Sequence, residues 1–164
     1  MKSVTVLCIA LAAGFLAGCS KPENAASPAR ETVHKHEHHP PHGGAPVELG
    51  KEEYHVELVR DAASGKLQAF VLDGELENFV RIAAPALEIT AKVSGHEEEL
   101  VFLPIPNSAT GEKVGDTSLF EAQAEWVRIT PAFDAVLKEI TVRTKTYTNV
   151  TFNFPKGSDE GGKR

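Results

Sequence analysis

Cysteine and methionine are nearly absent from this chain of 164 residues. Its two cysteines, Cys8 and Cys19, lie close to the N-terminus, and Met1 is its only methionine. The sequence after Cys19 therefore contains no thiol and no thioether. This absence excludes a disulfide framework, a cysteine nucleophile and a thiolate metal site from that part of the chain. It also argues against a copper(I) carrier, because copper(I) prefers cysteine and methionine ligands.

Basic stretches and catalytic motifs are absent as well. The chain has 17 Lys and Arg against 23 Asp and Glu, and its formal net charge is −6. An acidic chain without a basic stretch is a poor nucleic-acid binder, although it attracts cations. The sequence also has no phosphate-binding glycine loop, no Gly-x-Ser-x-Gly motif and no His-Glu-x-x-His motif. We therefore expect no nucleic-acid partner, no organic cofactor and no enzymatic activity.

Residues 1–18 predict an export signal. Lys2 precedes an apolar run, Val4 to Ala17, that is too short to cross a bilayer as a helix. The run leads into Leu16-Ala17-Gly18-Cys19, which resembles the lipobox of bacterial lipoproteins. The resemblance implies cleavage before Cys19 and attachment of diacylglycerol and palmitate-like acyl chains to this cysteine. Ser20 then favours sorting to the periplasmic face of the outer membrane. The alternative is an ordinary cleaved signal with a chance cysteine.

Residues 19–45 predict a disordered tether that carries a histidine-rich tract. The segment has one large aliphatic residue, Val33, so it cannot bury enough apolar surface to offset the entropy of ordering. Neutral imidazole binds zinc, nickel, cobalt and copper(II). The predicted metal ligands in the tract are His34, His36, His38, His39 and His42. The alternative is a solvated linker whose histidines serve solubility or respond to pH.

Residues 46–155 predict an all-β domain with the architecture of a single Ig-like antiparallel β-sandwich. Apolar residues alternate in short runs separated by turn residues, at the spacing typical of that class. The segment 118–127 also suits a short helix, a helical turn is an option around 131–137, and 156–164 predict a disordered polar tail. The expected strands are 54–59 and 66–73, which form a hairpin, and 87–93, 99–105, 118–127, 137–146 and 148–154.

His55 and Glu57 form a second group of candidate metal ligands. Residues i and i+2 of a strand share a face, so these two side chains project together, opposite Val56 and Leu58. They complete a metal site if His42 approaches them, which its glycine neighbours at 43 and 44 allow. The alternative is an ordinary polar pair on a solvent-exposed strand face. His96, beside Gly95, is expected in a solvated turn.

Several short segments carry a family resemblance. His42-Gly43-Gly44, the segment 54–59 and the segment 70–73 resemble a small extracytoplasmic β-sandwich domain of bacterial envelope lipoproteins. That domain is similar to the extra N-terminal domain of some heavy-metal efflux adaptor subunits, and the segments 110–112 and 118–120 fit the same pattern. The resemblance implies a periplasmic metal-associated binding module and marks His42, His55 and Glu57. Because the adaptor's coiled-coil and barrel segments are missing, we expect a different protein from the adaptor itself.

Two functional hypotheses follow. In the first, a lipid-anchored protein binds divalent transition-metal ions through the tract, as a metal buffer or as an accessory to an efflux protein. Its affinity then falls below about pH 6.5, because neutral imidazole is the ligand form. In the second, the domain is a structural module that binds another envelope protein or a glycan, and the histidines are incidental.

Overall fold

The computed structural model describes residues 39–158. Predictions for residues 1–38 and 159–164 lie outside this range, namely the export signal, lipidation of Cys19, most of the tether and the end of the tail. The same holds for His34, His36 and His38. Among the described residues, no helix is both long and apolar enough to span a membrane.

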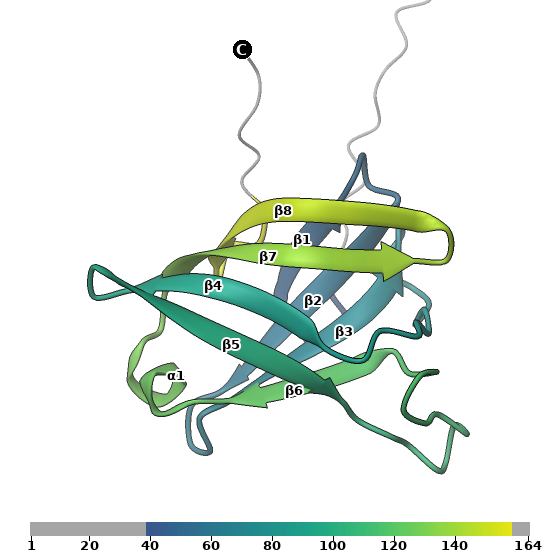
Figure 1. Ribbon diagram of the computed structural model, residues 1–164, viewed down its shortest axis with the longest axis horizontal. Helices are drawn as coiled ribbons and strands as arrows, with labels where there is room; N and C mark the ends of the chain where they lie inside the picture. Colours follow the sequence, from purple (N-terminus) through teal and green to yellow (C-terminus); the bar gives the residue numbers. More distant parts are fainter. Residues whose placement is uncertain (1–38, 159–164) are drawn as a thin grey trace, which may run out of the picture. The chain divides into compact units, whose positions relative to one another are not determined.

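The described part of the chain forms eight antiparallel strands and one short helix (Figure 1). The eight strands belong to one sheet, in the order β1-β2-β3-β6-β5-β4-β7-β8. The elements are β1 Ala45–Leu49, β2 Tyr54–Asp61, β3 Lys66–Asp73, β4 Leu87–Val93, β5 His96–Pro104, β6 Leu119–Gln123, α1 Glu125–Ile129, β7 Phe133–Val142 and β8 Lys145–Phe154.

The sheet curls until its two ends meet, so the domain is nearly barrel-shaped. In Figure 1, β1, β2 and β3 pass behind β4, β7 and β8. The backbone N–H of Ser158, just after β8, donates to the carbonyl of Pro46 in β1 at 2.9 Å. Alternate side chains of the strands fill the interior, where Leu67, Phe102 and Phe120 are at most 1% exposed. Burial of this apolar surface is the main force that holds the domain together.

The prediction of an all-β, antiparallel domain is confirmed. The predicted arrangement in two separate sheets is not, because all eight strands belong to one sheet. An Ig-like sandwich has two separate sheets. Here β5 joins both halves, because its first part pairs with β4 and its last two residues pair with β6. The contact is narrow, with only Leu103 opposite Glu121 and Pro104 opposite Phe120. The sequence pattern could not show that β5 pairs with both β4 and β6, because such a strand has the same alternation of apolar and polar residues as a strand with other partners.

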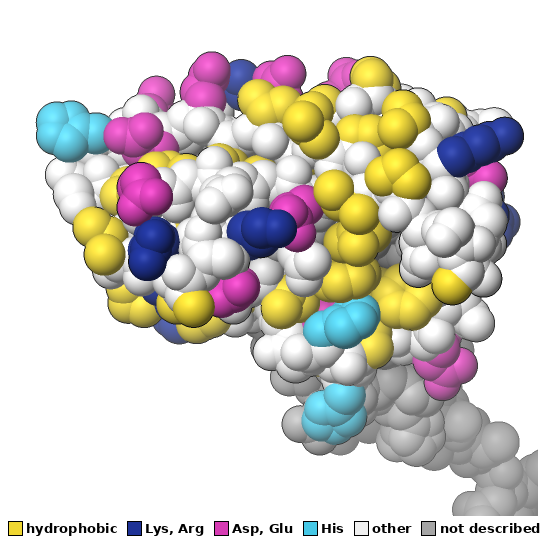
Figure 2. Space-filling view, turned by 90° about the horizontal axis from the view of Figure 1, so that it is seen from below, with side chains coloured by type: hydrophobic (Ala, Val, Ile, Leu, Met, Phe, Trp, Pro, Cys, Tyr) yellow, Lys and Arg dark blue, Asp and Glu magenta, His cyan; other side chains and the backbone are white. Residues whose placement is uncertain are grey.

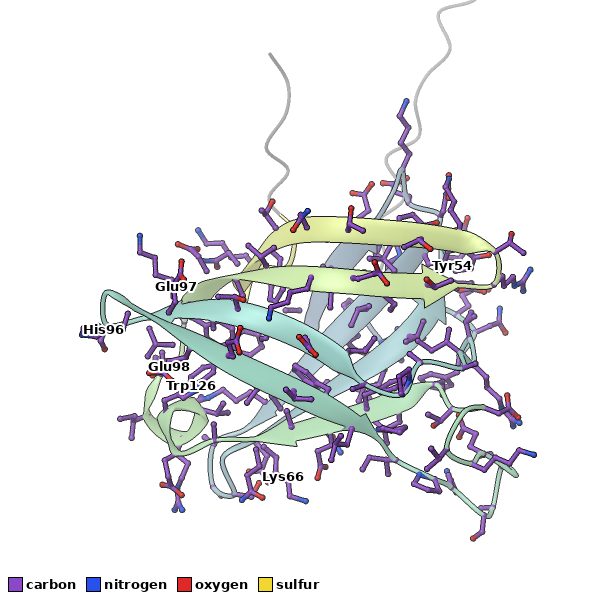
Figure 3. The ribbon with its side chains drawn as sticks, viewed as in Figure 1. Tyr54, Lys66, His96, Glu97, Glu98 and Trp126 are labelled. Atoms are coloured by element: carbon purple, nitrogen blue, oxygen red, sulfur yellow. The ribbon has the colours of Figure 1, made fainter. Side chains whose placement is uncertain are left out.

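Several strand predictions are confirmed. The expected hairpin is formed by β2 and β3, and β4 covers the predicted segment 87–93. His96 is exposed, as expected, but it is the first residue of β5 and follows the turn at 94–95 (Figure 3).

Other boundaries were wrong. The helical turn considered around 131–137 is part of β7, because Phe133, Ala135 and Leu137 alternate into the core. The turn that follows β7 is at 143–144, earlier than predicted. The segment 118–127 is divided between β6 and the start of α1, so both interpretations of it were partly right.

Ordered structure extends beyond both predicted ends of the domain. Ala45, assigned to the tether, lies in β1 and is 1% exposed. In the predicted tail, the N–H of Gly157 donates to the carbonyl of Asn153 at 2.7 Å. A Cβ atom on Gly157 would overlap the carbonyl of Pro46, so glycine is needed at this contact. The ordered domain therefore includes residues at both ends that composition alone assigned to disorder.

Candidate functional site

A buried carboxylate marks the candidate site. Glu57 lies in β2 and is 0% exposed, although its side chain points away from the core side chains of Val56 and Leu58. It is therefore buried on the outer face of the sheet, which is usually solvated in antiparallel proteins. An ionised carboxylate is costly to bury unless hydrogen bonds or opposite charges satisfy it.

Three donors from the segment before β1 satisfy the Glu57 carboxylate. Its Oε1 atom accepts from the backbone N–H groups of His42, at 2.9 Å, and Gly44, at 2.8 Å. Its Oε2 atom lies 2.8 Å from Nδ1 of His42. Both carboxylate oxygens are therefore engaged, and residues 42–44 are fastened onto the outer face of β2.

Local sequence explains this close approach. The N–H of Gly43 donates to the carbonyl of Pro40 at 3.0 Å, which turns the chain toward β2. A Cβ atom on Gly44 would overlap the carbonyl of Leu58 and would lie 2.9 Å from Cγ of Glu57. Only glycine fits at this position without a shift of the backbone.

Two phenylalanine rings hold the imidazole of His42. The His42 ring stacks on Phe70, with centroids 3.9 Å apart and planes 17° apart, and lies 5.7 Å from the ring of Phe79. The His42 side chain is 36% exposed and Phe79 is 51% exposed, so the group opens to solvent. On the face seen in Figure 2, a histidine side chain is bordered by hydrophobic ones.

The bond to Glu57 fixes which imidazole nitrogen of His42 is available. An ionised Glu57 only accepts hydrogen bonds, so beside it a neutral His42 ring carries its proton on Nδ1 and its lone pair on Nε2. Among residues 39–158, Nε2 forms no hydrogen bond. Histidines that ligate metals commonly donate their other N–H to a carboxylate in this way, which orients the ring and raises its basicity.

His55 is placed on the same face as Glu57, as predicted, but beneath a different segment. It is 5% exposed, and its Nδ1 lies 3.3 Å from the carbonyl oxygen of Asp73. The Asp73 carboxylate in turn holds the following loop through the side chain of Asn78 at 2.6 Å. The alternative of a solvent-exposed polar pair is wrong, because His55 is 5% exposed and Glu57 is 0% exposed.

The other predicted ligands have different environments. His39 is exposed and precedes His42 by three residues. His96 lies at the end of the view opposite Tyr54, the neighbour of His55, so it takes no part in this site (Figure 3). Within residues 39–158, no group of three or more histidine, cysteine, aspartate or glutamate side chains is arranged to hold a metal ion.

The sequence pattern missed the role of Phe70. In the β2–β3 hairpin, Phe70 is directly opposite Glu57. Its position follows from the hairpin register, which a two-strand alignment across the turn at 62–65 would have given. Phe79 had no such signal, because it lies in the loop after β3.

A second, partly buried hydrogen-bond network lies in the segments 110–112 and 118–120. Oε1 of Glu112 accepts from the N–H of Ser118 at 2.8 Å and from its hydroxyl at 2.6 Å, and Oε2 accepts from the hydroxyl of Thr110 at 2.6 Å. Burial raises the pKa of Glu112, but these bonds and the Arg81 guanidinium, 3.9 Å away, lower it by more, so the pKa lies below its ordinary value. The network fastens the long loop before β6.

The chain matches no known family model, and no curated protein or solved structure matches it. The resemblance to an efflux-adaptor domain therefore stays a prediction.

Proposed function

We propose that this protein is a lipid-anchored envelope protein that binds divalent transition-metal ions at a site completed by His42 on the surface of the domain. One observation carries the proposal: the buried Glu57 carboxylate holds Nδ1 of His42 at 2.8 Å, and Nε2 is left to bind a metal. His42 is thus the ligand with a fixed orientation, and the earlier histidines of the tract supply further nitrogen donors.

In this proposal Glu57 orients His42, whereas the sequence predicted that Glu57 itself is a metal ligand. Both of its oxygens bond to the segment 42–44, so its arrangement suits the orientation of His42 better than direct ligation. His55 is buried against Asp73 and is likewise better placed as a packing residue. The proposed ligands are therefore His42 and His39, with His34, His36 and His38 of the tract.

The ligand chemistry narrows the choice of ion. Imidazole nitrogens suit zinc, nickel, cobalt and copper(II), and the sequence after Cys19 offers no sulfur for copper(I). The proposed anchor at Cys19 places the site at the periplasmic face of the outer membrane. There the protein buffers these ions or passes them to an efflux protein.

Calorimetric titration tests the proposal. The full chain, purified in detergent, is titrated at neutral pH with zinc, nickel, cobalt and copper(II), and compared with the variants His42→Ala and Glu57→Gln. We expect His42→Ala to lose affinity about tenfold or more, and Glu57→Gln to lose about 10- to 100-fold, as when an orienting partner is removed. His96→Ala, which removes an exposed histidine elsewhere, is the matched control and keeps the affinity of the unmodified chain.

Two results would contradict the proposal. In the first, the chain binds none of the four ions. In the second, His42→Ala binds them with the same affinity as the control. Circular dichroism of each variant shows whether the domain is still folded, so loss of affinity is separated from loss of structure.

A further inference from the structure

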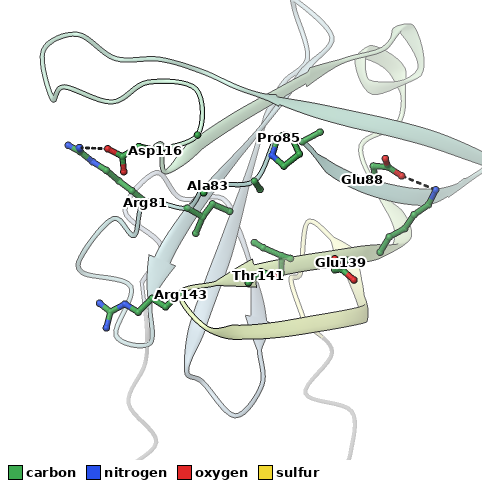
Figure 4. A pocket seen from close by; sticks show the side chains of 14 residues that line it. Arg81, Ala83, Pro85, Glu88, Asp116, Glu139, Thr141 and Arg143 are labelled. Carbon is green, nitrogen blue, oxygen red and sulfur yellow. Dashed lines mark hydrogen bonds and ion pairs between the residues drawn. The ribbon is translucent and has the colours of Figure 1, made fainter.

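A groove of about 740 Å³ lies between the segment 81–86 and the second half of β7 (Figure 4). This volume is in the range of natural binding sites. Side chains along the segment are small, with Ala83, Ala84 and Ala86 around Pro85. None of these residues belongs to the candidate metal site.

One wall of the groove is a strand edge that no other strand within residues 39–158 covers. β4 pairs with β7 only between Ile89, opposite Leu137, and Lys92, opposite Asp134. Beyond Leu137, β7 pairs with β8 alone. β4 begins at Leu87, two residues after Pro85, which has no N–H to give to a ladder. The chain therefore diverges from β7 and leaves its edge open.

The hairpin register shows which backbone groups face the groove. Val142 and Lys145 flank a two-residue turn, so they exchange both hydrogen bonds, and the pairs alternate from there. Thr141 and Glu139 consequently direct their N–H and C=O groups away from β8. The 2.8 Å bond between the hydroxyls of Thr141 and Thr146 fits this assignment, because side chains lie closer in pairs that exchange no backbone bonds.

Charges of both signs line the groove. Arg81 and Arg143 lie at one end with Asp116, and Glu139 and Glu88 lie toward the other, where Lys138 contacts Glu88 at 3.2 Å (Figure 4). Arg81 already contacts Asp116 at 3.4 Å, whereas Arg143 forms no ion pair among the described residues. An occupant with a carboxylate at the Arg143 end is therefore complementary to the groove.

We propose that the groove receives an extended peptide segment of a partner protein, which adds to the open edge of β7 as a strand and places an acidic side chain beside Arg143. An open edge offers main-chain hydrogen bonds to any extended chain, and the side-chain pockets beside it select the sequence. The alanines and proline of the opposite wall leave room for this strand. The proposal is independent of metal binding.

Random peptides of about ten residues, the upper length of most strands, are the probe. They are displayed on phage and selected on the full chain in detergent, and the enriched peptides are synthesised and titrated by fluorescence anisotropy. We expect enriched peptides to contain Asp or Glu and to protect the amides of Glu139 and Thr141 from hydrogen exchange. Arg143→Glu should weaken binding about tenfold, and Lys156→Glu, the same charge change on an exposed residue outside the groove, should not.

Two further variants separate the groove from general damage. Thr141→Pro removes the N–H that faces the groove, and Ala83→Trp fills the groove without a change in β7; both should weaken binding about tenfold or more. Peptides that bind both variants as well as the unmodified chain overturn the proposal, as does a selection that enriches no peptide. Sedimentation that shows a dimer dissociated by Thr141→Pro also overturns it, because a second copy of this chain is then the occupant.

Discussion

At the scale of single residues, the fit between Glu57 and the segment 42–44 has an energetic consequence. Hydrogen bonds to a charged group contribute about 1.5–3 kcal/mol each, and a buried carboxylate that loses its donors is strongly destabilising. Glu57 has three donors, and two of them come from the backbone. Stability and the orientation of His42 are therefore coupled, because the same contacts serve both.

Gly44→Ala tests this coupling. The added methyl group meets Val59 Cγ2 at 2.8 Å and Glu57 Cγ at 2.9 Å, so the segment must move away from β2. We expect the free energy of unfolding to fall by about 1–3 kcal/mol, as in other overpacked sites, and zinc affinity to fall about tenfold or more. Chemical denaturation and calorimetry measure the two effects.

The neighbouring glycine provides the control for Gly44→Ala. Gly43 has open space where a Cβ would lie, and its φ of 67° is a conformation that asparagine tolerates. Gly43→Asn should therefore keep nearly all of the stability and the zinc affinity. Equal losses in both variants would show that any change in the turn is harmful, and that contact with Glu57 is not the cause.

The sequence pattern singled out His42, His55 and Glu57 but did not predict their contacts. Alternation placed His55 and Glu57 on one face, because period two is a local property of a strand. Burial of that face depends on residues 40–44 and on the loop after β3, which contact it from a distance along the chain. Phe70 contacts His42 and Asp73 contacts His55 in the same way, so no local pattern distinguished the proposed ligand His42 from Glu57, which is proposed to orient it.

At the scale of elements, the loop between β5 and β6 depends on Glu112. This side chain bonds to Ser118 and Thr110 and lies near Arg81, which borders the groove. We expect Glu112→Gln to lower the free energy of unfolding at pH 7 by about 1.5–3 kcal/mol, the contribution of a hydrogen bond to a charged group. Chemical denaturation of both proteins measures the difference.

The pH dependence of this difference is fixed by the direction of the pKa shift. The pKa of Glu112 is lower in the folded chain than its ordinary value of 4.5. Its contribution is therefore complete above pH 4.5 and is lost as the pH falls through the folded pKa. Denaturation between pH 7 and pH 3 should show the unmodified chain and Glu112→Gln converging in stability at the acidic end. A gap that stays constant down to pH 3 would mean that ionisation of Glu112 contributes nothing.

Element boundaries were less predictable than element type. The alternation of Leu87, Ile89 and Ala91 gave β4 correctly, since each side chain enters the core. In β7, Leu137 and Ile140 are both buried, so the inward phase changes within the strand. A strict period-two pattern does not fit such a strand, and this is where the predicted start and turn were displaced.

At the scale of the whole molecule, the proposed function requires a membrane anchor near the histidine tract. Two acyl chains hold a protein stably on a bilayer, whereas a single myristoyl-sized chain gives only marginal binding. Lipidation of Cys19 would leave residues 20–38 between the acyl chains and the described part of the domain. Metal capture would then take place close to the bilayer, while the groove beside β7 stays accessible to another envelope protein.

Cys19→Ser is the substitution that tests the anchor. In cell fractionation we expect the unmodified chain to sediment with membranes and to resist a high-salt wash, because acyl chains bind through hydrophobic burial that salt does not weaken. Cys19→Ser should appear in the soluble fraction instead and keep its zinc affinity, since His42 and Glu57 are unchanged. Cys8→Ser is the matched control, because it replaces the other cysteine within the proposed signal and should leave the protein on the membrane. If Cys19→Ser sediments with membranes as fully as the control does, membrane attachment does not depend on lipidation of Cys19.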